Sequence, residues 1–270
     1  MNNQGKPQIL LTNDDGIKSP GLWAAAEALS KIGYVHVVAP RDQSSGTGRS
    51  YPSSSDGTIM EQTLQINGQE WQVFAIGGTP AQAVLHAVLE ILPQKPDLVV
   101  SGINYGENVG LGVTISGTVG AAMEAAALGI PSLAISLETD TQYHLTHSED
   151  VDFSTAGYFT AYFARLLLQK KFSQEVNLIK VEVPTHATPE TEWEVGGLSH
   201  NRYYDPVPAQ RTSWDVPGPI WYRHNEDINQ EPEGTDVHIL RTKKKVAVTP
   251  LNLDMTARVK FSDFDKLLRE

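Results

Sequence analysis

The residues best suited to chemistry are two adjacent aspartates near the N-terminus. Asp14 and Asp15 follow the short apolar run 9–11 and stand between Asn13 and Gly16. An apolar run that breaks into Asn, Asp and Gly is typical of a buried strand that ends in a turn. Two adjacent carboxylates repel each other in an enclosed site unless a cation lies between them, and a hard divalent metal is the simplest such cation. A solvated turn is the alternative that these residues alone leave open.

Two further polar segments come directly after apolar runs. The run 96–103 predicts a strand that ends at Asn104, and the run 35–39 predicts a strand followed by the Ser- and Gly-rich loop 41–55. Ligands of open α/β sheets bind outside the carboxyl ends of the strands. We therefore expect both segments to lie beside Asp14. A flexible linker is the alternative for the loop.

A run of small residues follows Ser116, Gly117 and Thr118 and predicts a closely packed helix over 119–129. The free N–H groups at the N-terminus of a helix, with hydroxyls beside them, form a site for an anion. This segment could therefore receive a small phosphate ester. Capping of the helix by Ser116 or Thr118 is equally compatible with the segment taken alone.

The elements that must position these residues alternate between strands and helices. Periodicity and turn residues predict helices over 20–32, from Pro80 onward, over 153–171 and over 262–268. Beyond the strands already named, they predict strands over 130–136, 176–183 and 246–250. They also predict a hairpin within 62–76 around Asn67-Gly68. This order favours a parallel sheet with right-handed crossovers. The stretch 184–235 has no clear period, which favours an oligomer interface or an active-site rim.

The composition narrows the class of protein. With 270 residues, 40% hydrophobic and 20% charged, the chain can bury a large core as one domain or one domain with an appendage. A net charge of -11 argues against a nucleic-acid partner. Because the chain has no cysteine, any metal must be held by oxygen or imidazole ligands. No apolar run is long enough for a signal peptide or a membrane span, so we expect a cytoplasmic protein with no membrane partner.

A series of motifs extends over nearly the whole chain. The motifs are Thr12-Asn13-Asp14-Asp15-Gly16-Ile17, Val38-Ala39-Pro40 with Ser45-Gly46, Gly78-Thr79-Pro80, Val100-Ser101-Gly102-Ile103-Asn104 with Gly106 and Asn108-Val109-Gly110, Ser116-Gly117-Thr118-Val119-Gly120-Ala121-Ala122, and Val248-Thr249-Pro250-Leu251. In order and spacing, this series resembles the SurE (survival protein E) nucleotidases. The chain departs from the family after Pro40, where Arg41-Asp42-Gln43-Ser44 replaces a sequence that commonly contains Asp-Arg-Asn.

The resemblance implies an α/β fold. The expected structure is a Rossmann-like three-layer core with a mainly parallel sheet, plus a C-terminal extension with a β-hairpin and a terminal helix for oligomerisation. Residues 1–140 would form the catalytic core. Residues 141–270 would complete that core and form the interface of a homodimer or homotetramer.

The resemblance also implies an activity, a metal-dependent phosphatase that hydrolyses nucleoside monophosphates. Such a 5'-nucleotidase could also cleave 3'-nucleotides and short polyphosphates. The implied ligands of one Mg²⁺ or Mn²⁺ per subunit are Asp14, Asp15, Ser45 and Asn104. The implied phosphate site is Ser116, Gly117 and Thr118. Four more residues are expected near the substrate, namely Asn13, Gly46, Thr79 and Asn108.

The expected mechanism is attack by a metal-activated water, with Asp14 or Asp15 as the catalytic base. A covalent aspartyl phosphate is the rival route, which we disfavour because a carboxylate bound to a metal is a poorer nucleophile. Two alternatives come from other classes of protein. A nicotinamide-dependent oxidoreductase would need G-x-G-x-x-G in the first strand-to-helix turn, where this chain has Asn-Asp-Asp-Gly. A non-catalytic nucleotide-binding protein is the second.

Overall fold

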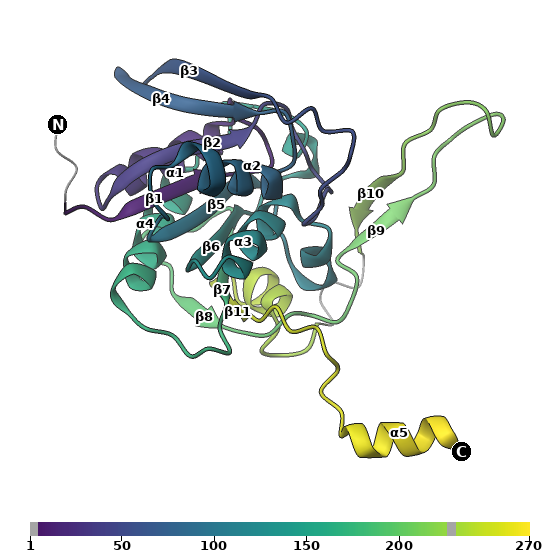
Figure 1. Ribbon diagram of the computed structural model, residues 1–270. Helices are drawn as coiled ribbons and strands as arrows, with labels where there is room; N and C mark the ends of the chain where they lie inside the picture. The colour runs from purple at the N-terminus through teal and green to yellow at the C-terminus, as the bar shows by residue number, and fades with distance from the viewer. Residues whose placement is uncertain (1–4, 226–230) are drawn as a thin grey trace.

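The computed structural model describes residues 5–225 and 231–270, and its centre is one nine-stranded sheet with helices on both faces (Figure 1). The strand order is β3-β4-β2-β1-β5-β6-β7-β11-β8. All neighbours from β4 to β7 pair in parallel, whereas β3 with β4 and β7 with β11 pair antiparallel. The expected α/β class with a mainly parallel sheet is confirmed.

The bounds of the elements follow the predicted runs closely in the first half of the chain. The strands are β1 (Gln8–Thr12), β2 (Tyr34–Pro40), β3 (Ile59–Ile66), β4 (Gln69–Ile76), β5 (Leu98–Tyr105), β6 (Ser132–Leu137), β7 (Leu178–Val183), β8 (Trp193–Val195), β9 (Tyr204–Val207), β10 (Trp221–His224) and β11 (Val246–Leu251). The longer helices are α1 (Pro20–Ser30), α2 (Pro80–His86), α3 (Gly117–Ala127), α4 (Ser154–Gln169) and α5 (Phe261–Arg269).

The two faces of the sheet are covered by different helix pairs. Side chains alternate along β1, so Leu11 lies in the core formed with α1 and α4, and Leu10 lies in the core formed with α2 and α3. Representative partners are Phe159 of α4 in the first core and Val84 of α2 in the second. The three-layer arrangement follows from this alternation, because both faces of a central parallel strand are apolar.

The predicted hairpin around Asn67-Gly68 is confirmed. Asn67 and Gly68 have φ angles of 49° and 78°, and they join β3 to β4. A two-residue hairpin turn of this kind needs positive φ at both positions, which Asn and Gly tolerate best.

The second half of the chain both extends the sheet and leaves it. Strands β7, β11 and β8 continue the sheet beyond residue 140, while β9 and β10 form a separate two-stranded sheet that projects as an arm (Figure 1). The predicted final helix is present as α5, which lies apart from the body and has no buried residue (Figure 1). In the described part of the chain, no helix combines the length and apolarity needed to cross a bilayer.

Helix α1 packs directly on the segment of β5 that leads to Asn104. A Cβ atom added to Gly21 of α1 would lie 2.1 Å from the carbonyl oxygen of Ile103. No real Cβ atom approaches a backbone oxygen so closely. The glycine therefore sets the distance between the helix and the strand end that carries Asn104.

We predict that Gly21→Ala lowers the free energy of unfolding by about 1–3 kcal/mol, because the added methyl group must displace β5 or α1. Gly157→Ala in α4 is the matched control, since its Cβ atom would lie 3.4 Å from the nearest atom, an ordinary contact. This control should be neutral or gain up to about 1 kcal/mol from higher helix propensity. Urea denaturation measures both, and equal stability of the two variants would contradict the close packing.

Candidate functional site

A cavity of about 310 Å³ opens where β1, β2 and β5 end, beside the N-terminus of α3. It brings together six of the residues expected from the sequence, namely Asp14, Ser45, Gly46, Asn104, Asn108 and Ser116. The rest of its lining comes from the segments that follow β5 and β6 and from the arm formed by β9 and β10.

The turn that carries the aspartates is closed by Asn13. Its side-chain Nδ2 donates to the Gly16 carbonyl at 3.1 Å, and its Oδ1 accepts from the Gly16 N–H at 3.2 Å. Gly16 itself has a φ of 94°, which favours glycine. The Ser44 N–H donates to the Asp14 carbonyl at 2.7 Å, so the loop after β2 lies against the turn. Asn13 therefore shapes the turn and does not line the cavity.

The carboxylate of Asp14 faces the N-terminus of α3. It accepts a hydrogen bond from the Thr118 hydroxyl at 2.5 Å. A Cβ atom at Gly117 would lie 2.7 Å from the Asp14 Cβ, so only glycine allows this approach. Burial raises the pKa of Asp14, and hydrogen bonds from Thr118 and from the Gly117 backbone oppose the rise.

The residues expected to hold phosphate do not all face the cavity. Gly117 and Thr118 contact Asp14, whereas Ser116 lines the cavity. Ser116 is also the N-cap of α3, and its Oγ accepts from the Val119 N–H at 3.0 Å. Ser116 therefore both caps α3 and lines the cavity.

Asp15 is tied to the end of β5. Its Oδ2 accepts from the Tyr105 N–H at 3.2 Å, and its Oδ1 accepts from Nε2 of Gln43 at 3.2 Å. Burial and then repulsion from Asp14 raise the pKa of Asp15 well above its usual value. Gln43 also donates to the His144 carbonyl at 2.8 Å, so it links the loop after β2 to a segment about 100 residues away.

Asn104 presents its side-chain oxygen as a free acceptor. Its Nδ2 donates to the carbonyls of Tyr105 at 3.1 Å and Gly106 at 2.7 Å, which fixes the orientation of the amide. Within residues 5–225 and 231–270, no donor is bonded to its Oδ1. This oxygen is therefore suited to a cation.

The donor set fits a hard divalent metal. The carboxylates of the two aspartates accept hydrogen bonds from the Thr118 hydroxyl, the Gln43 side-chain amide and the Tyr105 N–H, and none of these donors carries charge. Among the described residues, no three His, Cys, Asp or Glu side chains come together as a metal cluster. Asp14, Asn104 and Ser45 line the cavity, whereas Asp15 does not, so a metal there would be held by the Asp14 carboxylate and neutral oxygens, with Asp15 directly behind them in the chain turn. That set matches the oxygen preference of Mg²⁺ and Mn²⁺.

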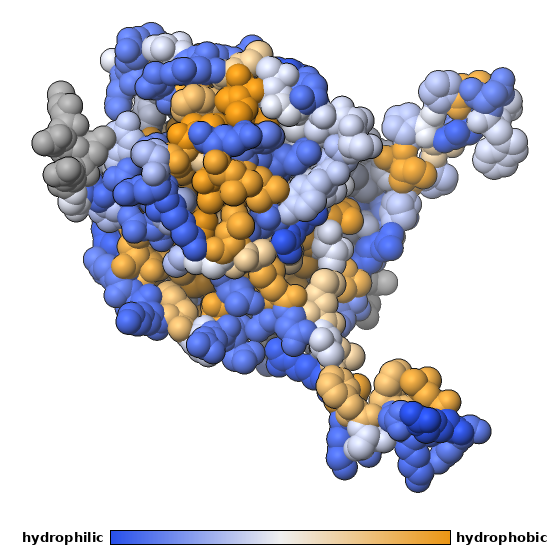
Figure 2. Space-filling model, viewed as in Figure 1, coloured by the Kyte–Doolittle hydropathy of each residue, from blue (hydrophilic) through white to orange (hydrophobic). Residues whose placement is uncertain are grey.

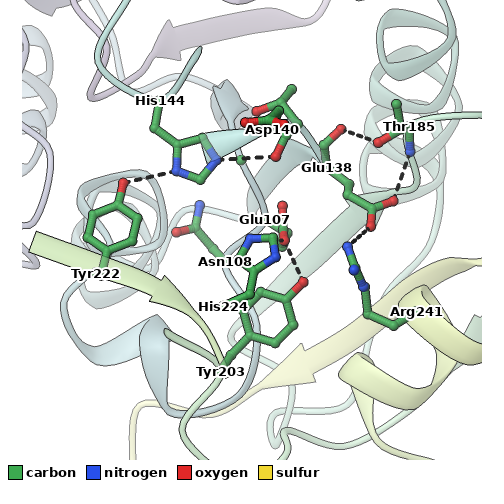
Figure 3. A network of polar contacts seen from close by, with 12 residues as sticks. Glu107, Asn108, Glu138, Asp140, His144, Thr185, Tyr203, Tyr222, His224 and Arg241 are labelled. Carbon is green, nitrogen blue, oxygen red and sulfur yellow. Dashed lines mark hydrogen bonds and ion pairs between the residues drawn. The ribbon is translucent and has the colours of Figure 1, made fainter. Parts of the chain in front are cut away.

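The arm contributes the aromatic residues Tyr204, Trp221 and Tyr222 to the cavity lining, and Figure 3 shows Tyr222 beside His144. The ring nitrogens of His144 lie 2.9 Å from the Tyr222 hydroxyl and 3.4 Å from the Thr139 carbonyl. Because a carbonyl only accepts, Nε2 carries the hydrogen and Nδ1 accepts from Tyr222. Burial lowers the pKa of His144 to about 4, so its imidazole is neutral at pH 7.

Glu107 is a buried acid beneath this aromatic wall. The Tyr203 hydroxyl donates to it at 2.5 Å, and Nε2 of His224 lies 3.7 Å from the same oxygen (Figure 3). Burial raises the pKa of Glu107 to about 7. The two ends of the arm, one before β9 and one in β10, therefore meet at a single titratable carboxyl.

Thr79 lies outside the cavity lining. Its Oγ1 accepts from the Gln82 N–H at 3.2 Å and donates to the Ser50 carbonyl at 2.8 Å, so it caps α2 and holds the loop after β2. Asn108 lines the cavity while its Nδ2 donates to the Ser136 hydroxyl at 3.0 Å.

Sequence reasoning did not find Gln43, Glu107, His144 or Tyr222. Gln43 stands in the stretch where the chain departs from the family. Tyr222 lies in the region 184–235, which the sequence favoured as an oligomer interface or an active-site rim without indicating which of its aromatic residues line the cavity.

Comparison with known proteins gives a consistent result. A sequence profile described as "Survival protein SurE" matches residues 9–205. The "5'-nucleotidase SurE" of Thermococcus kodakarensis is 40% identical over 262 residues, which cover 97% of this chain and 98% of that protein. The protein of the same name from Archaeoglobus fulgidus is 41% identical over 94% of both chains. The crystal structure of the SurE protein from Aquifex aeolicus is 32% identical, with a TM-score of 0.75 over 98% of this chain and 100% of that one.

We predict that Glu107→Gln flattens the pH dependence of stability. The pKa of Glu107 is higher in the folded state, about 7, than the usual 4.5, so the folded state loses stability as pH rises between these values. The loss amounts to as much as about 3 kcal/mol, and it should be absent in Glu107→Gln, which keeps an acceptor for Tyr203.

Urea denaturation at several pH values and one protein concentration measures this effect. Glu70→Gln is the control, because Glu70 is exposed on β4. The burial argument fails if Glu107→Gln and the unchanged chain show the same slope between pH 4.5 and 7.

Proposed function

The chain belongs to the survival protein SurE family, and from this premise we propose that it is a 5'-nucleotidase, which releases phosphate from nucleoside monophosphates. Its curated relatives named 5'-nucleotidase SurE align with it over nearly their full length. The observation that carries the proposal is that Asp14, Ser45 and Asn104, which come from three separate segments, line one cavity.

The proposed cofactor is one divalent metal ion per subunit, Mg²⁺ or Mn²⁺, held by Asp14, Asp15, Ser45 and Asn104. In support, burial raises the pKa of both aspartates, and their hydrogen-bond partners are uncharged. When bound, such a cation would neutralise charge on the phosphoryl oxygens and lower the pKa of a water molecule.

The residues of the chain would then act on water and phosphate. A water oxygen attacks phosphorus, the bond from phosphorus to the nucleoside oxygen breaks, and a carboxylate takes the water proton, which passes on to the departing nucleoside oxygen. In support of this role for Asp14 or Asp15, hydrogen bonds hold both carboxylates in place, the first from Thr118 and the second from the Tyr105 N–H. Ser116, at the N-terminus of α3 and in the cavity, would receive the phosphate.

The nucleoside would lie on the aromatic side of the cavity. Tyr204, Trp221 and Tyr222 of the arm line that side, and flat rings stack well on nucleobases. A volume of about 310 Å³ is within the range of small-molecule sites.

We predict that Asp15→Asn lowers kcat/KM for nucleoside monophosphates about a thousandfold, or about 4 kcal/mol of transition-state stabilisation. The unchanged chain should release phosphate with Mg²⁺ or Mn²⁺ and stop when a chelator is added. Phosphate release across a panel of 5'- and 3'-mononucleotides and short polyphosphates measures both effects and defines the substrate range.

Asp42→Asn is the matched control, because Asp42 is an exposed aspartate of the neighbouring loop and should leave kcat/KM unchanged. A folded Asp15→Asn variant with nearly normal turnover would remove Asp15 from the site. Activity that depends on nicotinamide, or nucleotide binding without phosphate release, would favour the other two classes of protein.

We further propose that the chain forms a homodimer or homotetramer through its C-terminal part. Helix α5 has nine residues and buries none of them, and it exposes Phe261, Phe264, Leu267 and Leu268 (Figure 2). A helix this short is marginal in water by itself. Its apolar face therefore favours contact with a second copy of the chain.

We predict that the double variant Phe264→Asp and Leu267→Asp shifts the assembly to monomers, because it places two charges in the apolar face of α5. Size-exclusion chromatography with light scattering gives the mass at a fixed protein concentration. Ser262→Asp, on the same helix, is the control that should keep the oligomer. The proposal is wrong if the unchanged chain is a monomer or if the double variant keeps its mass.

A further inference from the structure

Strand β7 carries a fully buried lysine between two fully buried carboxylates. Nζ of Lys180 lies 3.1 Å from Oδ2 of Asp236 and 3.3 Å from Oε1 of Glu182, and all three side chains have an exposed fraction of 0%. Buried charges of this kind are costly unless they are paired and hydrogen-bonded. The name buried triad is used below for these three residues.

Both carboxylates of the buried triad hold the backbone of the loop that follows β5. Oε2 of Glu182 accepts from the Asn108 N–H at 3.0 Å, and Oδ2 of Asp236 accepts from the Gly110 N–H at 2.9 Å. Asp236 also accepts from the N–H groups of Ser199 and Val237, both at 2.9 Å, through Oδ1. One ammonium group therefore joins the loop to β7 and to the segment that leads into the arm.

The held loop belongs to the cavity. Residues 105–109 all line it, directly after the candidate metal ligand Asn104. Gly106 and Gly110 have φ angles of 90° and 54°, so the loop bends at two residues that tolerate many backbone conformations. Contacts from outside the loop must therefore select the conformation that lines the cavity.

The charge of Lys180 is what allows both carboxylates to stay in place. Without the ammonium group, Glu182 and Asp236 would be two buried anions close together, and one would have to take up a proton or move toward water. Either change weakens a charge-assisted hydrogen bond to the loop.

We propose that Lys180 is a positioning residue for the phosphatase reaction: through Glu182 and Asp236 it holds residues 106–110, which follow β5, in the shape that binds substrate. Lys180 does not line the cavity, so its effect reaches the substrate through the segments that its two carboxylate partners hold. The kinetic part of this inference rests on the proposed function, whereas the loop-holding part does not.

The kinetic test compares KM and kcat of Lys180→Met, using AMP and GMP as substrates with Mn²⁺ present. We expect KM to rise at least tenfold and kcat to change less than threefold. The double variant Lys180→Met and Glu182→Gln should reverse most of this rise in KM, because it removes one negative charge together with the positive one and keeps an acceptor for the Asn108 N–H. Ser132→Ala is the control, since Ser132 is buried on β6 and donates only to the Ala122 carbonyl.

A second variant keeps the test decisive if Lys180→Met does not fold. Glu182→Ala leaves the Lys180–Asp236 pair balanced and frees the Asn108 N–H, so KM should again rise about tenfold. A folded Lys180→Met or Glu182→Ala variant with unchanged KM would overturn the proposal, as would a Ser132→Ala variant whose KM rises equally.

Hydrogen exchange separates this inference from the proposed function. In Lys180→Met, the amides of Asn108 and Gly110 should lose at least tenfold in protection, whereas those of β6 should keep theirs. If the unchanged chain hydrolyses no mononucleotide, the proposed function fails while this measurement still decides the loop-holding role. Unchanged protection at both amides would overturn it.

Discussion

The repulsion between two adjacent buried carboxylates is the constraint on which the site depends. Asp14 and Asp15 are almost fully buried, and their partners, which include the Thr118 hydroxyl and the Tyr105 N–H, are uncharged. Such bonds oppose the cost of burial but supply no positive charge. The fold therefore holds the pair in a state that a divalent cation would stabilise.

The buried triad shows the opposite use of buried charge in the same fold. Lys180 there balances Glu182 and Asp236 from within the chain, and the balanced group holds a loop. At Asp14, which lines the cavity, and at the adjacent Asp15, the side-chain hydrogen-bond partners are uncharged and leave the negative charge unbalanced. The two arrangements are linked, because the loop that the triad holds begins just after Asn104. The balanced charges of the buried triad thus shape one wall of the cavity, whereas the charge of the two aspartates is available to bind a cation.

Local signals explain how much of this could be predicted from the sequence. The hairpin at Asn67-Gly68 and the strand ends at Asp14 and Asn104 follow from turn residues and short apolar runs, which act over a few positions. Long-range contacts explain what could not be predicted. His144 acquires its partner Tyr222 only when β10 packs beside the segment that follows β6, and strands of three or four residues such as β8 to β10 are too short to show a period. SurE motifs located the candidate metal ligands but not this wall.

The most direct test of the central claim is anomalous diffraction from crystals of the unchanged chain grown with Mn²⁺. We expect one strong anomalous peak per subunit, within about 2.5 Å of oxygens from Asp14, Asp15 and Asn104. A peak at some other site, or none at this cavity in crystals that bind Mn²⁺ elsewhere, would contradict it.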